Sequence, residues 1–142
     1  MASQSAEAVL EINERFYRAF ANRDVAAMSA VWHETLPVVC VHPGWAALEG
    51  RARVLASWRR ILQNPSSPVV RCVRAKAHLL GNHALVVCYE AIGASRLVAT
   101  NAFALDGDTW RMVLHQAGPV ANSDEDDEVD DPEREIEPSE LN

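Results

Sequence analysis

The chain has 142 residues, of which 49% are hydrophobic and 23% charged, with six glycines, seven prolines and three cysteines. This length and composition fit one domain of ordinary size, and they exclude collagen, coiled coils and wholly disordered chains. No apolar run approaches the roughly 20 residues of a membrane helix, so we expect no membrane span. The chain opens without a secretory signal pattern and contains no C-x-x-C pair. We therefore expect a reduced, cytoplasmic protein without a zinc site or a disulfide framework.

The net charge of −7 is unevenly distributed along the chain. Residues 122–142 contain eleven acidic residues and one basic residue, a balance of −10, whereas residues 1–121 contain nine acidic and twelve basic residues, a balance of +3. The acidic segment has too few apolar residues to offset the entropy of ordering it, so we expect one domain over 1–121 and a disordered tail over 122–142. The cations of the domain are scattered, which argues against a nucleic-acid partner.

The first half of the chain has the periodicity of helices. Apolar residues recur at steps of three and four over residues 9–20, with charged residues between them, which predicts an amphipathic helix. Asp24 can cap a second helix over residues 25–32. An extended run over residues 36–42 ends at a Pro-Gly turn, and a third helix is expected after Gly50.

The second half of the chain is richer in β-branched residues and predicts four strands. They are expected at roughly 69–79, 83–93, 96–105 and 109–117, with short turns of glycine, asparagine and aspartate between the later ones. Such turns make neighbouring strands antiparallel. The element order ααβαββββ therefore predicts an α+β fold, in which three helices lie on one face of a single curved antiparallel sheet.

A polar residue stands on the apolar face of the third of these strands. Asn101 alternates with Ala99 and Phe103, so its amide is expected to point inward with them. A buried amide without partners costs about 1–3 kcal/mol, so it must find hydrogen bonds. Either neighbouring backbone groups satisfy Asn101 or it faces a ligand, and the pattern leaves both interpretations open.

A histidine ends the apolar face of the early extended run. His42 follows Cys40 on that face and stands just before the Pro-Gly turn. It is either a structural residue or an acid or base, since imidazole titrates near neutrality. Trp45 follows in the loop, where it either lines the mouth of a pocket or fills the core.

The face that His115 occupies depends on the turn before the last strand. A two-residue turn places Met112 and Gln116 on the face of Asn101, whereas a three-residue loop places His115 there. One residue of register exchanges the two faces, so the pattern alone does not choose between Gln116 and His115.

Glu90 lies in an apolar run and is expected to face solvent; if it were buried, its pKa would rise and it would become a candidate acid or base. The histidines have no spacing that marks a metal site, and no glycine-rich phosphate loop or nucleophile motif is present. We therefore expect neither a metal nor a cofactor.

Five segments carry a family resemblance, and they occur in the element order described above. They are Phe16-Tyr-Arg-Ala-Phe-Ala-Asn-Arg-Asp24, Val41-His-Pro-Gly-Trp45, Leu48-Glu-Gly-Arg51, Ala99-Thr-Asn-Ala-Phe103 and Trp110-Arg-Met-Val-Leu-His115. Over roughly residues 6–120 the chain resembles the SnoaL-like branch of the nuclear transport factor two superfamily. The resemblance implies a cone-shaped fold with a cavity at one end, and a homodimer that pairs through the outer face of the sheet.

The resemblance also allows a comparison with the ketosteroid isomerases of that superfamily. Their pattern uses a tyrosine and a protonated aspartate as oxyanion donors and a second aspartate as the base. Approximate alignment places Phe16 at the tyrosine, Asn101 at the oxyanion aspartate and His42 near the base. Phenylalanine cannot donate a hydrogen bond, so the isomerase triad is not preserved and steroid isomerisation is not expected.

These observations lead to one main hypothesis and two rivals. The chain is expected to bind a small apolar molecule containing a carbonyl group, with His42 as a proton shuttle and Asn101 as an oxyanion donor in chemistry of the isomerase, cyclase or dehydratase type. The pocket is expected to be lined by Phe16, Trp32, Trp45, Trp58, Phe103, Met112 and His115. One rival is a non-enzymatic dimerisation module whose acidic tail binds a partner. The other is a cavity filled by the aromatic residues themselves.

Overall fold

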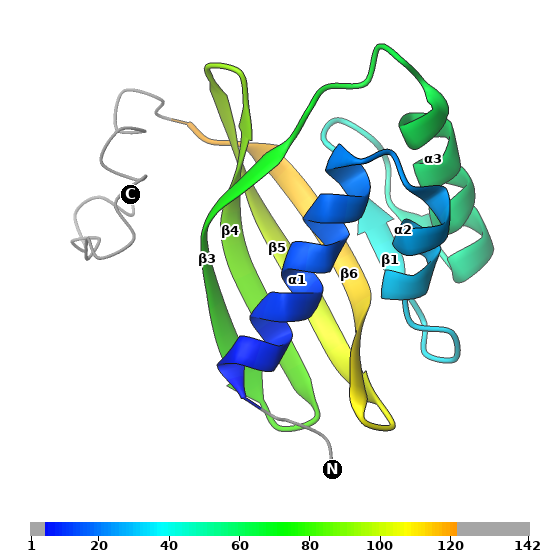
Figure 1. Ribbon diagram of the computed structural model, residues 1–142, viewed down its shortest axis with the longest axis vertical. Coiled ribbons are helices and arrows are strands. Elements are labelled where there is room, and N and C mark those ends of the chain that lie inside the picture. Colours follow the sequence, from blue (N-terminus) through cyan, green and yellow to red (C-terminus); the bar gives the residue numbers. More distant parts are fainter. Residues whose placement is uncertain (1–4, 122–142) are drawn as a thin grey trace.

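The computed structural model describes residues 5–121, which form a curved six-stranded sheet with three helices on its concave side (Figure 1). The helices are α1 (Ala6–Ala21), α2 (Val25–Val31) and α3 (Arg51–Gln63). The strands are β1 (Val39–Val41), β2 (Leu48–Glu49), β3 (Arg71–Leu80), β4 (His83–Ile92), β5 (Ser95–Asp106) and β6 (Thr109–Pro119). The predicted α+β fold is confirmed. The prediction of a disordered tail falls on residues outside the described range.

Capping side chains set the start of the first two helices. The Ser5 side chain accepts a hydrogen bond from the backbone N–H of Ala8 at 3.2 Å, and α1 begins there. The Asp24 carboxylate accepts one from the N–H of Ala27 at 3.0 Å, which confirms the predicted cap of α2. Both caps satisfy N–H groups that have no partner inside the helix.

The sheet has the order β2-β1-β6-β5-β4-β3. Strands β3 to β6 form an antiparallel meander, as the short turns predicted. Strand β1 differs, because it lies parallel to β6 and pairs on its other side with β2. Strand β2 was not predicted, since two residues are too few to show alternation. α1 lies across the concave face of the meander, and α3 packs beside β1 and β2 (Figure 1).

A β-bulge in the β5–β6 hairpin decides which residues of β6 face the interior. Phe103 pairs with Met112 and Asn101 pairs with His115, so β6 has one residue more than β5 between the two pairs. The extra residue allows both Met112 and His115 to point inward, and they are 0% and 1% exposed. Gln116 is exposed. Both sequence alternatives were incomplete because strict alternation does not allow for a bulge.

Among residues 5–121, no helix combines the length and apolar character needed to cross a membrane.

Candidate functional site

Five polar side chains meet between α1 and the concave face of the sheet, and we call them the polar cluster. They are Asn13 and Tyr17 of α1, Glu90 of β4, Asn101 of β5 and His115 of β6, and each is at most 5% exposed. Asn13 and Tyr17 stand four positions apart and so share the inward face of the helix. The three strand residues occupy inward positions of neighbouring strands. Polar groups this deeply buried need hydrogen-bond partners.

Asn101 is the centre of the hydrogen-bond network. Its Nδ2 donates to Asn13 Oδ1 at 2.8 Å and to the Tyr17 hydroxyl at 3.2 Å. Its Oδ1 lies 2.6 Å from Nδ1 of His115. The Tyr17 hydroxyl in turn donates to Oε2 of Glu90 at 2.7 Å. The amide predicted to point inward is therefore satisfied by side chains from α1 and β6 rather than by backbone groups.

The network also fixes the tautomer of His115. Because an amide oxygen can only accept, Nδ1 of His115 carries the proton and donates it to Asn101 Oδ1. The other ring nitrogen, Nε2, then holds a lone pair, and it lies 3.7 Å from Oε2 of Glu90. A potential proton acceptor and a carboxyl group thus face each other inside the core.

Burial favours the uncharged form of all three titratable groups of the polar cluster. It lowers the pKa of His115 to about 3, with a smaller contribution from His42. It raises the pKa of Glu90, partly offset by the hydrogen bond from Tyr17. It also raises the pKa of Tyr17 well above its ordinary value, and the nearby Glu90 adds to that shift. The expectation that Glu90 faces solvent is wrong, because its position on β4 points inward.

His42 lies in a second polar group at the end of β1. Its Nε2 lies 2.9 Å from the hydroxyl oxygen of Ser57, which donates its own proton to the carbonyl of Val54 at 2.7 Å. That oxygen therefore accepts from Nε2–H of His42. Burial lowers the pKa of His42 to about 4. His42 does not hydrogen-bond to Asn101, and the imidazole beside Asn101 is that of His115.

Aromatic rings connect the two histidines. The ring of Trp58 has its centroid 4.9 Å from that of His42 and 5.8 Å from that of His115. Phe16 packs against Trp58 at 5.2 Å and against His115 at 4.8 Å. Trp45, which is 41% exposed, covers His42 from outside with a centroid separation of 4.7 Å. A continuous row of rings thus runs from the surface to the polar cluster.

The described residues are closely packed around the polar cluster. The predicted lining residues are almost fully enclosed by other protein atoms, since each is at most 1% exposed: Phe16, Trp32, Trp58, Phe103 and Met112. A hollow of about 280 Å³ exists elsewhere, between α1 and the β5–β6 turn, and Glu11, Arg15 and Asp108 are among its lining residues.

Two members of the polar cluster were not predicted from the sequence. Phe16 aligns approximately with a tyrosine of the isomerases, but the adjacent Tyr17 supplies the hydroxyl that Phe16 lacks. Asn13 was also missed. The signal was present in the sequence, since both residues lie on the apolar side of the first helix at a spacing of four.

Histidine, cysteine, aspartate and glutamate side chains of residues 5–121 do not gather in any group of three suited to a metal ion.

Comparison with known proteins agrees with the fold described above. Residues 9–122 match the family defined by the SnoaL-like domain. A proposed dehydratase of the NTF2-like family from Streptomyces avermitilis is 31% identical, with a TM-score of 0.76 over 82% of this chain and 96% of that one. A candidate association domain of a calcium/calmodulin-dependent protein kinase type II from Thiobacillus denitrificans is 33% identical, with a TM-score of 0.65 over 77% of this chain and 92% of that one.

A plant protein is similar to most of this chain, at lower identity. The F-box protein SKIP8 of Arabidopsis thaliana is 22% identical over 120 residues, which are 83% of this chain and 52% of that protein. The chain therefore spans about half the length of this relative.

Proposed function

We propose that this chain, which belongs to the SnoaL-like family of the NTF2-like superfamily, catalyses acid–base chemistry of the dehydratase type on a small, largely apolar molecule that carries a carbonyl and a hydroxyl group. The observation that carries the proposal is the facing pair of Glu90 and His115, whose Oε2 and Nε2 atoms lie 3.7 Å apart inside the core. The proposed dehydratase from Streptomyces avermitilis, 31% identical, supports the reaction class.

A facing acid and base suit dehydration because that reaction moves one proton each way. The lone pair of His115 Nε2 takes a proton from the carbon next to the carbonyl, a carbon–carbon double bond forms, and the carbon–oxygen bond to the hydroxyl breaks. The Glu90 carboxyl gives its proton to the leaving hydroxyl, which departs as water. The pair as a whole keeps its net charge, which matters because a dry interior penalises any net charge.

Asn101 and Tyr17 support this chemistry by holding the pair and the developing charge. Asn101 fixes the proton of His115 on Nδ1, so that Nε2 is free to accept. Its Nδ2 and the Tyr17 hydroxyl are buried donors that hold Asn13, Tyr17 and Glu90 in this structure, and under the proposal one of them turns to a negative oxygen of the substrate, which it would stabilise strongly in the dry interior. Under this proposal the earlier assignment of Asn101 as an oxyanion donor is retained.

The class of substrate follows from the residues around the pair. Phe16, Trp58, Phe103 and Met112 surround it with apolar surface, so an extended polar molecule would lose its hydration without compensation. Because these side chains are closely packed, a ligand requires them to move. We propose that it enters beside Trp45, whose ring is 41% exposed and lies over His42. His42 then lines the route to the site.

The test is an assay of small 3-hydroxycarbonyl compounds for formation of the conjugated product, measured by its ultraviolet absorbance. Glu90→Gln and His115→Gln should each lower the rate by about 100-fold or more, the usual value of a positioned acid or base. Glu49→Gln makes the same change at an exposed position and should leave the rate unchanged. If both site variants remain folded and turn over such a substrate as fast as the wild-type protein, the assignment of the pair is wrong.

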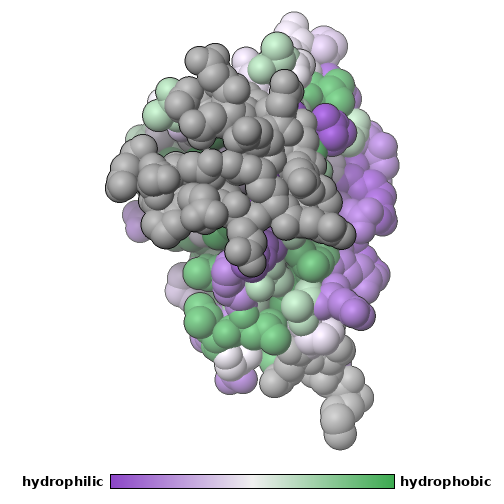
Figure 2. Space-filling model, turned by 90° about the vertical axis from the view of Figure 1, so that its left-hand side faces the viewer, coloured by the Kyte–Doolittle hydropathy of each residue, from purple (hydrophilic) through white to green (hydrophobic). Residues whose placement is uncertain are grey.

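We further propose that the chain forms a homodimer through the outer face of the sheet. On that face Tyr89 pairs with Val98 and Leu85 pairs with Ala102, so apolar groups line neighbouring strands. Val98 is 37% exposed, and Figure 2 shows apolar residues on the side of the molecule that β3 and β4 form. The relative from Thiobacillus denitrificans is described as an association domain, which supports self-association of this fold.

Sedimentation equilibrium tests the dimer directly. The wild-type chain should sediment at twice the monomer mass, and Val98→Asp should shift it to the monomer because a charge would be buried at the interface. Glu14→Asp, on the exposed side of α1, should leave the mass unchanged. A wild-type monomer at high micromolar concentration would contradict the proposed interface.

A further inference from the structure

Two cysteines lie side by side at the edge of the polar cluster, and the acid–base chemistry proposed above uses neither. Cys72 is on β3 and Cys88 is on β4, and their thiols hydrogen-bond to each other. Cys72 pairs with Glu90, two positions from Cys88. Cys88 itself lies opposite the irregularity in β3 between Val73 and Lys76, where β3 has one residue more than β4.

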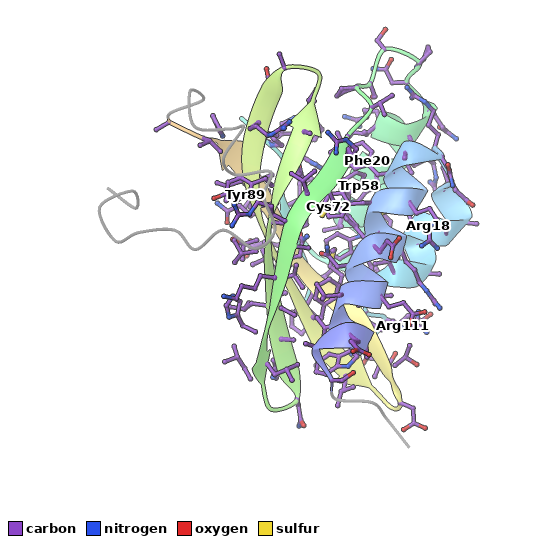
Figure 3. All side chains as sticks on the ribbon, turned by 60° about the vertical axis from the view of Figure 1, so that its left-hand side comes forward. Arg18, Phe20, Trp58, Cys72, Tyr89 and Arg111 are labelled. Atoms are coloured by element: carbon purple, nitrogen blue, oxygen red, sulfur yellow. The ribbon has the colours of Figure 1, made fainter. Side chains whose placement is uncertain are left out.

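The two thiols have different surroundings. Cys88 is 0% exposed, and its Sγ lies 3.3 Å from the Tyr17 hydroxyl and 3.9 Å from Nδ2 of Asn101. Cys72 is only partly buried and sits on β3, the last strand of the sheet. Figure 3 shows Cys72 on the side of the sheet that faces α1, opposite Tyr89. Cys72 is therefore the more accessible of the two thiols to a small reagent.

Hydrogen bonds make Cys72 the more readily ionised of the two. Its Sγ receives a hydrogen bond from Nδ2 of Asn13 at 3.7 Å. The Cys88 thiol and Asn13 together lower the pKa of Cys72, against the opposing effects of burial, Glu90 and Glu14. The pKa of Cys88 is raised, because it donates to Cys72 and is buried. A reachable thiol with a lowered pKa beside a second thiol is the arrangement found at redox-sensitive cysteines.

We propose that Cys72 is a peroxide-reactive cysteine and that Cys88 resolves it by forming a disulfide between β3 and β4. The Cys72 thiolate attacks one oxygen of hydrogen peroxide, the O–O bond breaks, and the products are a sulfenic acid and hydroxide. The Cys88 sulfur then attacks the sulfenic sulfur. An S–S bond forms, the S–O bond breaks, and the released hydroxide takes up the Cys88 proton and leaves as water.

The disulfide links this reaction to the polar cluster. It replaces the thiol of Cys88, which lies against the Tyr17 hydroxyl, by a sulfur without a proton. It also makes the Cys72 sulfur, which accepts a hydrogen bond from Asn13, an uncharged and weaker acceptor. Oxidation would therefore alter the contacts of Tyr17 and Asn13, two of the residues that hold Asn101 in place.

The test treats the reduced full-length protein with hydrogen peroxide, blocks remaining thiols with iodoacetamide after denaturation, and maps the peptides by mass spectrometry. The wild-type chain should lose the mass of two hydrogens, keep one alkylated cysteine, Cys40, and recover all three thiols with dithiothreitol. Cys88→Ser should accumulate a sulfenic acid at Cys72 that dimedone traps. Cys72 should react at least about tenfold faster than Cys40, which is 0% exposed.

Cys40→Ser is the matched control, because it removes the third thiol and should leave the Cys72–Cys88 link intact. Cys72→Ser should leave Cys88 reduced. A link involving Cys40, or equal rates at Cys72 and Cys40, would overturn the proposal. So would three alkylated thiols in a treated, folded wild-type chain. These readouts concern sulfur alone, so they are independent of whether the chain catalyses dehydration.

Discussion

At the scale of single residues, one amide holds the polar cluster together. Asn101 donates to α1 through Asn13 and Tyr17, and it accepts from β6 through His115. An asparagine is suited to this place because it offers donors and an acceptor on one short side chain and carries no charge. An aspartate there would lose both donors and would add a buried charge.

Replacing Asn101 should therefore destabilise the fold. Asn101→Ala leaves Asn13 Oδ1 and His115 Nδ1 without their partner in a dry core, and we expect the free energy of unfolding to fall by about 2–5 kcal/mol in urea titrations. Asn82→Ala changes an exposed asparagine in the β3–β4 turn and should cost less than about 0.5 kcal/mol. Equal losses in the two variants would show that the network contributes little to stability.

The buried histidines make stability depend on pH. The pKa of His115 is lowered to about 3 and that of His42 to about 4, from an ordinary 6.5. Between about pH 6.5 and 4 the unfolded chain binds protons on these residues that the folded chain does not. The free energy of unfolding should thus fall as the pH falls, by up to about 1.4 kcal/mol per pH unit for each histidine.

A variant separates this effect from other titrations. His115→Gln should reduce the slope of unfolding free energy against pH in that window by the contribution of one proton, about 1.4 kcal/mol per pH unit. Glu90 acts in the opposite direction. Its raised pKa gives stability that is present below 4.5 and is lost as the pH rises through the raised value. An unchanged slope in His115→Gln would mean that His115 already titrates normally when folded.

At the scale of elements, a single arginine joins the ends of two helices. Arg51, the first residue of α3, donates to the carbonyls of Trp32, His33 and Ser29 at 2.7, 3.0 and 3.1 Å. These carbonyls lie at the end of α2, where no further turn supplies a hydrogen bond. The planar guanidinium reaches all three at once, which a lysine ammonium cannot do in the same geometry.

Arg51→Met should therefore lower the free energy of unfolding by about 1.5–3 kcal/mol, the usual value for hydrogen bonds from a charged group. Arg51→Lys should recover only part of that loss, because lysine retains the charge but lacks the planar guanidinium that donates to all three carbonyls. Arg53→Met, at an exposed position two residues along α3, serves as the control and should change stability by less than about 0.5 kcal/mol. Urea unfolding of the four proteins distinguishes these outcomes.

At the scale of the whole molecule, the loop beside β1 and the central strands should differ in how readily they open. Trp45 lies in the loop over residues 43–47, outside any helix or strand, and its ring covers His42. β4 and β5, by contrast, are central strands paired on both sides. Loops with little buried surface open more often than central strands.

Amide hydrogen exchange should show this difference. In the wild-type chain, residues 43–47 should exchange fastest among these segments and β5 slowest. Trp45→Ala should speed exchange in β1, since His42 and its neighbours lose their cover, and should leave β5 unchanged. If the variant instead accelerated exchange throughout the sheet, Trp45 would be part of the stabilising core rather than a movable cover.

The sequence alone predicted much of this molecule. The periodicities located all three helices and the four long strands, and the cap at Asp24 occurs as expected. The inward amide of Asn101 followed from alternation along one strand. These features are local, because a helix face or a strand face is set by residues a few positions apart.

The tertiary structure decided the composition of the site. A bulge in β6 turned His115 inward beside Asn101, α1 supplied Tyr17 and Asn13, and Glu90 proved to be buried. It also showed that His42 bonds Ser57 instead of Asn101. Each of these outcomes depends on groups far apart in the chain, and on register shifts of one residue that local patterns do not encode. Local chemistry therefore specified the elements, and their packing specified which side chains meet.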